Sequence, residues 1–525
     1  MLKKITLISV ASFILLSTTA LAGKGGRINI YSQEEPENLN PLFQNSESSK
    51  SAYNLLYSGL LRVDENFDYY TDLAVSIPTR ENKGVVFNDE GMVVTYKLKE
   101  LSFWHDGKPV TSDDIMFTWK CYINPDIPKL NNEETQAYSK IYKIETPDEK
   151  TVKIYFKEDY SKYKDLFKYI LPKHGFDPKS VLKIQQNHPF NIAPIGSGPF
   201  KFVDWKKGKY LILDSYDKYY TNKPNSDQIT YFYGDLDKNM TKEIENGKIH
   251  LVQTKSDEYF ESNVKQHLMK SKKYAIPTTM MEELAFNTEG VFKDLNLRKA
   301  IAFSIDRERI TDKFLDLESA WSDAHPNSSI YDSTLKNEYF YDLKMSKYYL
   351  DNSGWIIDEK DGLRKKSGKI LTINLLTGQN KAQTEFIKYM TEVSKYLGIK
   401  INLKQSYQIE DEMKNKNSYD MVVYTKSPNI NGLDRMGYFG SKNMLPKGKN
   451  YSRFVSYPMD DIFYSPFTVN ILKEQREVTK ILKENIPILP LFTYTKNVAI
   501  SASLQNFKPN SSAGSTWNSI EWWTN

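Results

Sequence analysis

The clearest structural signal in the chain lies in residues 370–403, which read ILTINLLTGQNKAQTEFIKYMTEVSKYLGIKINL. Residues 370–376 and 399–403 are typical of strands. The helix predicted between them, over 381–397, repeats apolar residues at spacings of three or four on one face, namely Ala382, Phe386, Met390, Val393 and Leu397. Gly398 ends that helix. A strand–helix–strand unit of this kind predicts a parallel sheet in the C-terminal half, and with it an α/β fold class.

Shorter signals outside this unit predict further elements. Strands are expected at 27–31, 93–98 and 151–156, and a helix at 52–61. A second helix begins after Thr111-Ser112-Asp113-Asp114, which has good N-cap chemistry. Since the sequence shows no repeat, low-complexity tract or flexible linker, we expect ordered segments to join the domains.

Length and charge exclude several classes of protein. A chain of 525 residues is long enough for two or three domains with sizeable cores. Apolar residues at 40% and charged residues at 26% are ordinary for a globular protein, and exclude wholesale disorder or a polytopic membrane protein. The net charge of +5 is small for this length, so no nucleic-acid partner is expected. The densest basic run, Arg364-Lys365-Lys366, is interpreted as a solvated hairpin.

The N-terminus has the pattern of a secretory signal peptide. Lys3 and Lys4 precede an apolar run of about 12 residues, which is too short to span a bilayer of about 30 Å. The run ends in small residues, which predicts cleavage between Ala22 and Gly23. The residue after this site is Gly23 rather than the cysteine that a bacterial lipoprotein needs, so we expect a free periplasmic protein.

Motifs for catalysis and for metal binding are missing from the sequence. The only cysteine, Cys121, can form no intramolecular disulfide and is interpreted as a small buried residue. No two of the six histidines are three to five residues apart, so a helical zinc motif is missing. There is also no nucleophile elbow, P-loop or dinucleotide fingerprint. We therefore expect no enzyme, metal or cofactor, although two carboxylates could still meet in space as in a glycosidase.

Several blocks, in a fixed order, resemble one known family. The resemblance begins with Glu37-Asn38-Leu39-Asn40-Pro41 and continues through residues 56–61, 95–98 and 103–114, the last reading FWHDGKPVTSDD. Further blocks follow at 196–205, 284–287, 297–307, 348–355, 371–376 and 419–421. Together they cover essentially the whole predicted mature chain. This series resembles the family 5 extracellular solute-binding proteins, the dipeptide, oligopeptide and nickel binders of ABC importers.

The resemblance implies a bilobed periplasmic-binding-protein-like (Venus-flytrap) fold with mixed sheets. Lobe I would combine residues 23–57, 196–280 and 487–525 after a signal peptide at 1–22. A subdomain at 58–195 would be inserted into lobe I. Lobe II would run over 281–486. Ligand would lie between the lobes and shift the population toward a closed form, which the importer's permease subunits recognise.

The resemblance also implies where a peptide would bind. In peptide-binding relatives a strand of each lobe hydrogen-bonds the peptide backbone. The matching residues here are, in lobe I, Tyr31, Ser32, Gln33, Glu34 and Glu35, and in lobe II, Val423, Tyr424, Thr425, Lys426, Ser427 and Asn429. We expect a monomer that carries peptides or peptide-like solutes. The alternative is a secreted hydrolase, or a scaffold without transport, that uses the same lobes.

One position departs from the family pattern. Asn429 stands about where peptide-binding relatives carry an Asp that pairs with the ligand's ammonium, and Asn supplies no charge for it. The segment after it resembles a subgroup that imports modified or N-blocked peptides. Asp434 and Arg435 in that segment could form a surface ion pair, or Asp434 could turn into the cleft and restore the charge.

Overall fold

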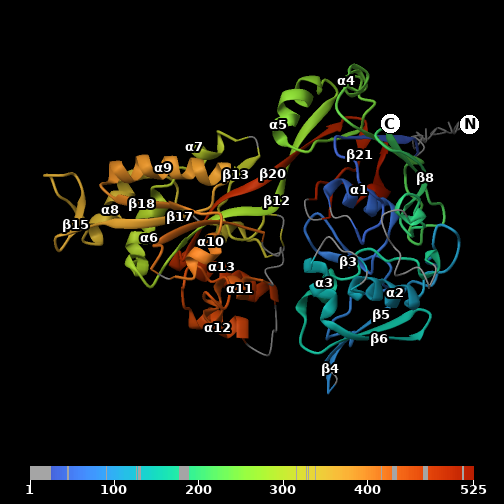
Figure 1. Cartoon of the computed structure of the whole chain (residues 1–525), viewed down its shortest axis with the longest axis horizontal. Helices are drawn as coiled ribbons and strands as arrows, with labels where there is room; N and C mark the ends of the chain where they lie inside the picture. Colours follow the sequence, from blue (N-terminus) through green and yellow to red (C-terminus); the bar gives the residue numbers. More distant parts are fainter. Residues whose placement is uncertain are drawn as a thin grey trace, which may run out of the picture.

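The computed structural model describes residues 25–524 except 44–45, 90, 126, 128–131, 177–187, 315, 327, 329, 337, 416, 428–433, 465–470 and 511–512. The predicted signal peptide lies outside the described residues, and so do Ala22, Gly23 and Asn429. Two bodies lie side by side in Figure 1. We keep the names lobe I and lobe II for them, although their exact boundaries stay a prediction.

One mixed sheet of eleven described strands runs through both bodies. Its main path, from lobe II to lobe I, is β18 (Lys400–Gln405), β17 (Thr372–Thr377), β19 (Met421–Lys426), β12 (Ser271–Phe286), β20 (Ile488–Ser501), β11 (Leu251–Gln253), β1 (Arg27–Ser32), β10 (Gln228–Tyr233), β9 (Tyr210–Ser215) and β8 (Phe200–Lys206). The eleventh strand, β13 (Leu317–Ser319), pairs with β20. Both parallel and antiparallel pairs occur along the path, which confirms the predicted α/β class with mixed sheets.

Two long antiparallel strands connect the bodies. In lobe I, β12 pairs from Ser271 to Pro277 with the second half of β20. In lobe II, its residues from Met281 onward pair with the first half of β20. The register shifts between Pro277 and Met281, and a shift of this kind bends a strand and increases its twist. Figure 1 shows β12 and β20 running between the bodies. The bend therefore lies where a hinge between the lobes would be placed.

A smaller α/β unit lies beside the lobe I part of the sheet, at the lower right of Figure 1. Its four-stranded antiparallel sheet has the order β4 (Val85–Asn88), β5 (Gly91–Lys97), β7 (Thr151–Phe156) and β6 (Ile141–Asp148). The helices α2 (Ser112–Ile123) and α3 (Asn132–Ser139) and the strand pair β2 (Leu61–Val63) and β3 (Tyr69–Thr71) accompany it. Its apolar residues share one hydrophobic cluster with lobe I, so the two units share a core.

Lobe II has its own core, and several helices surround it. These are α6 (Leu295–Phe303), α8 (Leu343–Asn352), α9 (Lys381–Leu397), α11 (Arg435–Phe439), α12 (Tyr457–Tyr464) and α13 (Ile471–Asn485). Two hydrophobic clusters fill it, one on each face of the sheet, and all their members lie between residues 284 and 492. None of the described helices has both the length and the apolar character needed to cross a membrane.

The strand–helix–strand unit is confirmed. Helix α9 spans Lys381–Leu397, begins with an N-terminal capping box at Asn380 and ends at Gly398 with φ +73°. The strands on either side of it, β17 and β18, are parallel. Helix α2 likewise begins after Thr111, where Asp114 completes a capping box. Cys121 is buried, as interpreted.

The helix predicted over 52–61 is displaced. Helix α1 spans Glu47–Leu56, because the Ser46 side chain caps it by accepting from the Ser49 amide. The chain leaves the helix five residues earlier than predicted in order to pair with residues 167–168. The Leu60 amide donates to the Phe167 carbonyl at 2.9 Å, and a Cβ on Gly59 would lie 2.3 Å from the Lys168 carbonyl oxygen. Tertiary pairing therefore overrides the local helical pattern.

The basic run at 364–366 is only in part the solvated hairpin that the sequence predicts. It forms β15 (Arg364–Lys366) in a small three-stranded sheet with β14 (Ile356–Ile357) and β16 (Lys369–Ile370). Arg364, however, is buried, and its guanidinium lies 2.5 Å from Asp351. It also donates to the Leu397 carbonyl, the last residue of α9. Arg364 thus attaches this sheet to the end of the helix.

Candidate ligand-binding cleft

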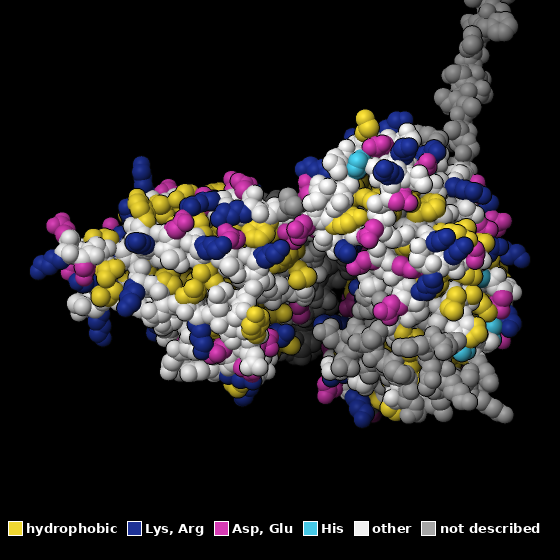
Figure 2. Space-filling view, turned by 45° about the horizontal axis from the view of Figure 1, so that its top comes forward, with side chains coloured by type: hydrophobic (Ala, Val, Ile, Leu, Met, Phe, Trp, Pro, Cys, Tyr) yellow, Lys and Arg dark blue, Asp and Glu magenta, His cyan; other side chains and the backbone are white. Residues whose placement is uncertain are grey.

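A hollow lined by residues of both bodies lies between the lobes. We call it the interlobe cavity; it measures about 920 Å³. Lobe I and its inserted unit contribute residues from α1, β2, β3, the segment 160–169 and the C-terminal tail. Lobe II contributes Ser427, Asp434, Gly437, Tyr438, Gly448 and Lys449. Figure 2 shows the surface hollowed between the two bodies. Residues of both lobes therefore meet one shared space, as a hinge-closing binding protein requires.

Aromatic side chains dominate the lobe I side of the interlobe cavity. They are Tyr69, Tyr70, Tyr122, Tyr138, Tyr160, Tyr169 and Trp517, which come from segments far apart in the sequence. The rings of Tyr70 and Trp517 meet edge to face, with centroids 6.3 Å apart. Burial raises the pKa of Tyr70 to about 12, so its hydroxyl stays protonated at neutral pH and can donate a hydrogen bond.

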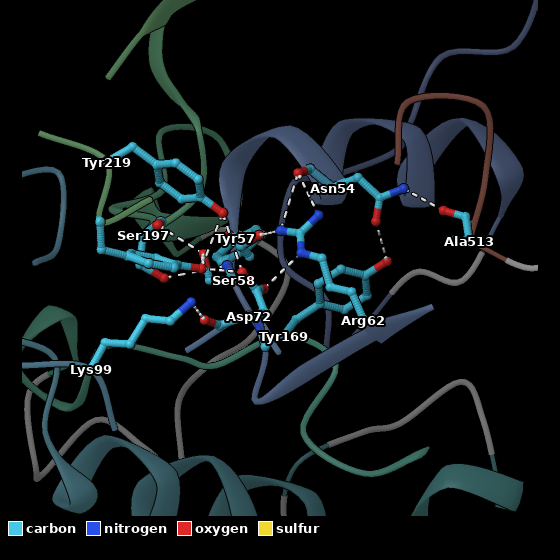
Figure 3. A network of polar contacts seen from close by, with 12 residues as sticks. Asn54, Tyr57, Ser58, Arg62, Asp72, Lys99, Tyr169, Ser197, Tyr219 and Ala513 are labelled. Atoms are coloured by element: carbon cyan, nitrogen blue, oxygen red, sulfur yellow. Dashed lines mark hydrogen bonds and ion pairs between the residues drawn. The ribbon is translucent and has the colours of Figure 1, made fainter. Parts of the chain in front are cut away.

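A buried ion pair between Arg62, which lines the cavity, and Asp72 lies at the centre of a polar network (Figure 3). The Arg62 Nε donates to the Asp72 carboxylate at 2.7 Å, and a guanidinium Nη donates to the Tyr57 carbonyl at 2.7 Å. Asp72 also accepts from the Gly59 amide at 2.8 Å and from the Tyr220 hydroxyl. Several donors and acceptors therefore compensate both charges, which a buried pair needs in order to be stable.

The same network positions Asn54, which lines the cavity from α1. The Asn54 side-chain amide donates to the Ala513 carbonyl, and its oxygen accepts from the Tyr169 hydroxyl at 3.2 Å. Its backbone carbonyl accepts from Arg62. These contacts, visible in Figure 3, connect the helix, the inserted unit and the tail. Hydrogen bonds thus hold these three segments together beside the cavity.

On the lobe II side, β19 places its last residues in alternate directions. Thr425 donates to Glu282 at 2.7 Å. Lys426 turns inward, and its ammonium lies 2.5 Å from the fully buried carboxylate of Glu283. Burial raises the pKa of Glu283, while Lys426 opposes that shift. Ser427 lines the interlobe cavity. The Lys426 ammonium is therefore held inside lobe II, and the next residue faces the cavity.

A second hollow of about 400 Å³ lies at the open edge of β19. The pairing of β17 with β19 ends at Val423, so the following residues of β19 lack a strand neighbour on that edge. Tyr424 and Thr425 line this hollow together with residues that follow β17 and β18, including Gly378 and Ser406. The carboxyl ends of these parallel strands meet there, a common position for ligands in α/β sheets.

The predicted lobe I segment is largely engaged with its own lobe. Tyr31 is buried and donates to the Gly234 carbonyl at 2.8 Å. The Ser32 hydroxyl donates to the Glu34 carbonyl, and the Gln33 amide donates to the Gln253 carbonyl. Glu35 accepts from Trp205 Nε1 at 2.8 Å and from the Gly208 amide.

In this segment only the Glu34 side chain is exposed. None of Tyr31, Ser32, Gln33, Glu34 and Glu35 is among the described residues that line the interlobe cavity.

Asp434 and Arg435 are directed differently. Arg435 is buried and pairs with Asp323 at 2.7 Å, and it also donates to Thr479 in α13. Asp434 lines the interlobe cavity. Of the predicted site residues, the structure thus brings Ser427 and Asp434 to this cavity, and Tyr424 and Thr425 to the hollow beside it. Val423 packs in the lobe II core.

Sequence reasoning missed the aromatic and cationic side chains of the inserted unit. The segment 160–169 alone contributes Tyr160, Lys162, Lys164, Lys168 and Tyr169, among others, to the cavity. The only available signal was the excess of aromatic residues, 13% of the chain, which does not indicate a position. Among the described residues no group of three or more His, Cys, Asp or Glu side chains is arranged to hold a metal ion.

Comparisons with known proteins find a family model and relatives that match most of the chain. The model of a family described as bacterial extracellular solute-binding proteins, family 5 middle, matches residues 69–442. Over 524 residues the chain is 26% identical to the oligopeptide-binding protein AppA of Bacillus subtilis (strain 168), covering 96% of this chain and 93% of that protein.

Two solved structures share the fold. The unliganded open form of the periplasmic murein tripeptide-binding protein MppA matches with a TM-score of 0.76 at 18% identity, covering 95% of this chain and 97% of that one. NikZ from Campylobacter jejuni in complex with Ni(L-His) matches with a TM-score of 0.57 at 22% identity, covering 96% and 100%.

Proposed function

Because the chain belongs to the family 5 bacterial extracellular solute-binding proteins, we propose that it captures peptides or peptide-like solutes between its lobes and delivers them to an ABC importer. Membership of this family makes it a binding protein and not an enzyme. The observation that carries the proposal is the interlobe cavity, because lobe I and lobe II both line it. A solute held there contacts both lobes at once and favours their closure.

The dimensions and lining of the interlobe cavity support a ligand of peptide size. Its volume of about 920 Å³ is near the upper end of the usual range of ligand pockets, about 300–1,000 Å³. Aromatic rings offer apolar area to side chains, and groups such as Asn54 and Ser427 offer hydrogen bonds. The name of the relative AppA, an oligopeptide-binding protein, points the same way.

The open edge of β19 supports binding through the peptide backbone. An extended peptide can add to a strand edge whose N–H and C=O groups lack a strand neighbour. Residues 424–426 offer such an edge after β17 ends. Backbone pairing depends little on the peptide's side chains, which suits the transport of mixed peptides.

Location and partner form the second part of the proposal. The signal pattern at residues 1–22 directs the chain to the periplasm, with Gly23 as the first mature residue. There it would meet the permease subunits of its importer as a monomer. Osmotic shock should release this form without detergent.

The proposal is tested by identifying the solute and watching closure. Mass spectrometry of small molecules that co-purify with the protein should find peptides, and a nickel chelate would instead place the protein with relatives such as NikZ. Adding the identified peptide should shrink the radius of gyration in solution scattering. Turnover of the peptide, or unchanged scattering at saturation, would contradict the proposal.

A further inference from the structure

The interlobe cavity carries an excess of positive charge. Its described lining holds seven Lys and Arg side chains and two Asp side chains, a difference of five. The whole chain of 525 residues has the same formal net charge of +5. The net charge of this one lining thus equals that of the whole chain.

Most of these cations have no carboxylate partner. Arg62 is paired with Asp72, but no ion pair within the described part of the chain engages the other six, which are Lys50, Lys140, Lys162, Lys164, Lys168 and Lys449. Two buried cations of lobe II differ from them, since Lys426 and Arg435 each have a carboxylate within 2.7 Å. Unlike these two side chains, the six lysines of the cavity lining have no carboxylate within ion-pair distance in the described part of the chain.

Two of the six lysines, Lys50 and Lys164, are half-buried. Burial lowers the pKa of the Lys164 ammonium, although Glu81 and Asp165 oppose the shift. Its ammonium lies 5.5 Å from the centroid of the Tyr69 ring, and no carboxylate of the described residues lies within ion-pair distance of it. Water screens such a site less than an open surface, so an incoming anion gains more there.

Lys449 extends the charge to the other lobe. It is exposed, and its ammonium lies 5.7 Å from the Tyr438 ring centroid. A ligand carboxylate between Lys449 and the lobe I lysines would be attracted from both sides, and like-charge repulsion between the lobes would fall as it binds. The same repulsion opposes closure around a cationic ligand.

We propose that the interlobe cavity selects peptides of net negative charge, rich in Asp and Glu. This inference rests on the proposed function of peptide capture and adds the class of peptide. Acidic side chains would meet the uncompensated lysines, and the aromatic rings would contact the aliphatic parts of the peptide.

The test uses the full mature protein and synthetic peptides that differ only in whether Glu, Gln or Lys fills their variable positions. An equimolar mixture of several lengths is incubated with the protein, and the bound fraction is identified by mass spectrometry and titrated by calorimetry. We expect the Glu peptides to bind at least about tenfold more tightly than the Lys peptides. Raising the salt from about 0.05 M to about 0.5 M should reduce that preference.

Different failures identify different errors. Equal binding of all three peptide types would overturn the charge selection and leave peptide capture standing. Tighter binding of the Lys peptides would do the same. Retention of no peptide at all would overturn the proposed function and this inference together.

Variants connect the preference to particular lysines. The double change Lys50→Gln/Lys164→Gln should reduce the preference for Glu over Gln peptides about tenfold. The matched control is Lys238→Gln/Lys242→Gln on the exposed surface of α4 (Lys238–Glu245), which should leave it unchanged. If the first variant fails to fold, Lys449→Gln on the exposed face of lobe II replaces it. An unchanged preference in the folded variant would refute the inference.

Discussion

Replacing Lys426 with Met separates a structural role of this residue from a role in ligand binding. The ammonium of Lys426 lies 2.5 Å from the carboxylate of Glu283, and both side chains are at most 2% exposed. Met keeps most of the aliphatic stem and removes the charge. Loss of one partner from a buried ion pair typically costs about 3–5 kcal/mol, because the other charge is left uncompensated. We expect a loss of this size in the free energy of unfolding.

The pH dependence of that loss provides a sharper test. Burial raises the pKa of Glu283 in the folded state, and Lys426 opposes the shift. Without Lys426 the folded protein retains a proton on Glu283 above the unfolded pKa of about 4.3. Stability of the variant then falls as pH rises through this window, by about 1.4 kcal/mol per pH unit until the folded pKa is reached. The difference from wild type should therefore be larger at pH 8 than at pH 5.

Urea denaturation at both pH values measures these differences, and the two lobes are fitted as separate transitions if two are seen. Lys447→Met, at an exposed lysine of lobe II, is the control and should change little. The double variant Lys426→Met/Glu283→Gln should recover much of the loss, because no buried charge remains. A Lys426→Met protein of wild-type stability that no longer binds its peptide would refute the reasoning and make Lys426 a ligand contact.

Three further predictions concern other residues. Burial lowers the pKa of His250 to about 4, and its Nδ1 accepts a hydrogen bond from the Asn29 amide at 2.8 Å. The stability that neutral His250 contributes is therefore present above about pH 6.5 and is lost as the pH falls toward 4. Between pH 7 and pH 5 the free energy of unfolding, measured by denaturation, should fall by about 2 kcal/mol less in His250→Gln than in wild type. In Gly196→Ala the new Cβ would lie 1.8 Å from the Leu56 carbonyl oxygen, so we expect a loss of about 3 kcal/mol or more, or no soluble protein on expression. With Asn429 in place of an acidic residue, N-acetylated peptides should bind about as well as free ones. Any preference for the free amine in calorimetry should disappear in Asp434→Asn, and a preference that survives would contradict this interpretation of the loop.

Regular elements could be predicted from the sequence where local signals agree. For α9 the apolar period, the N-cap at Asn380 and the C-terminal Gly398 all indicate the same 17 residues, and the helix has those bounds. For α1 they conflict. Its serine-rich first half, Ser46 to Ser51, lacks an apolar period, and its end depends on pairing with residues that lie over a hundred positions away.

The cavity could be predicted only in part. The strand β19 follows from the family pattern, but the direction of each side chain depends on partners such as Glu283 and Asp323, which no local pattern reveals. Part of the aromatic and basic lining comes from irregular segments, around residues 160–169 and in the tail, and hydrophobic periodicity does not apply to such segments. Their position in the cavity depends on how the inserted unit packs on lobe I.

The paired strands β12 and β20 also make lobe II exchangeable. Pro277 and Thr495 are register partners in the lobe I part of this ladder, so the chain leaves lobe I and returns to it at neighbouring points. If the residues between them were deleted and replaced by a short turn, β12 and β20 would form a hairpin within lobe I. The same two positions are natural junctions for grafting the corresponding segment of a relative, which would exchange one wall of the cavity in a single cassette and leave the opposite wall as it is.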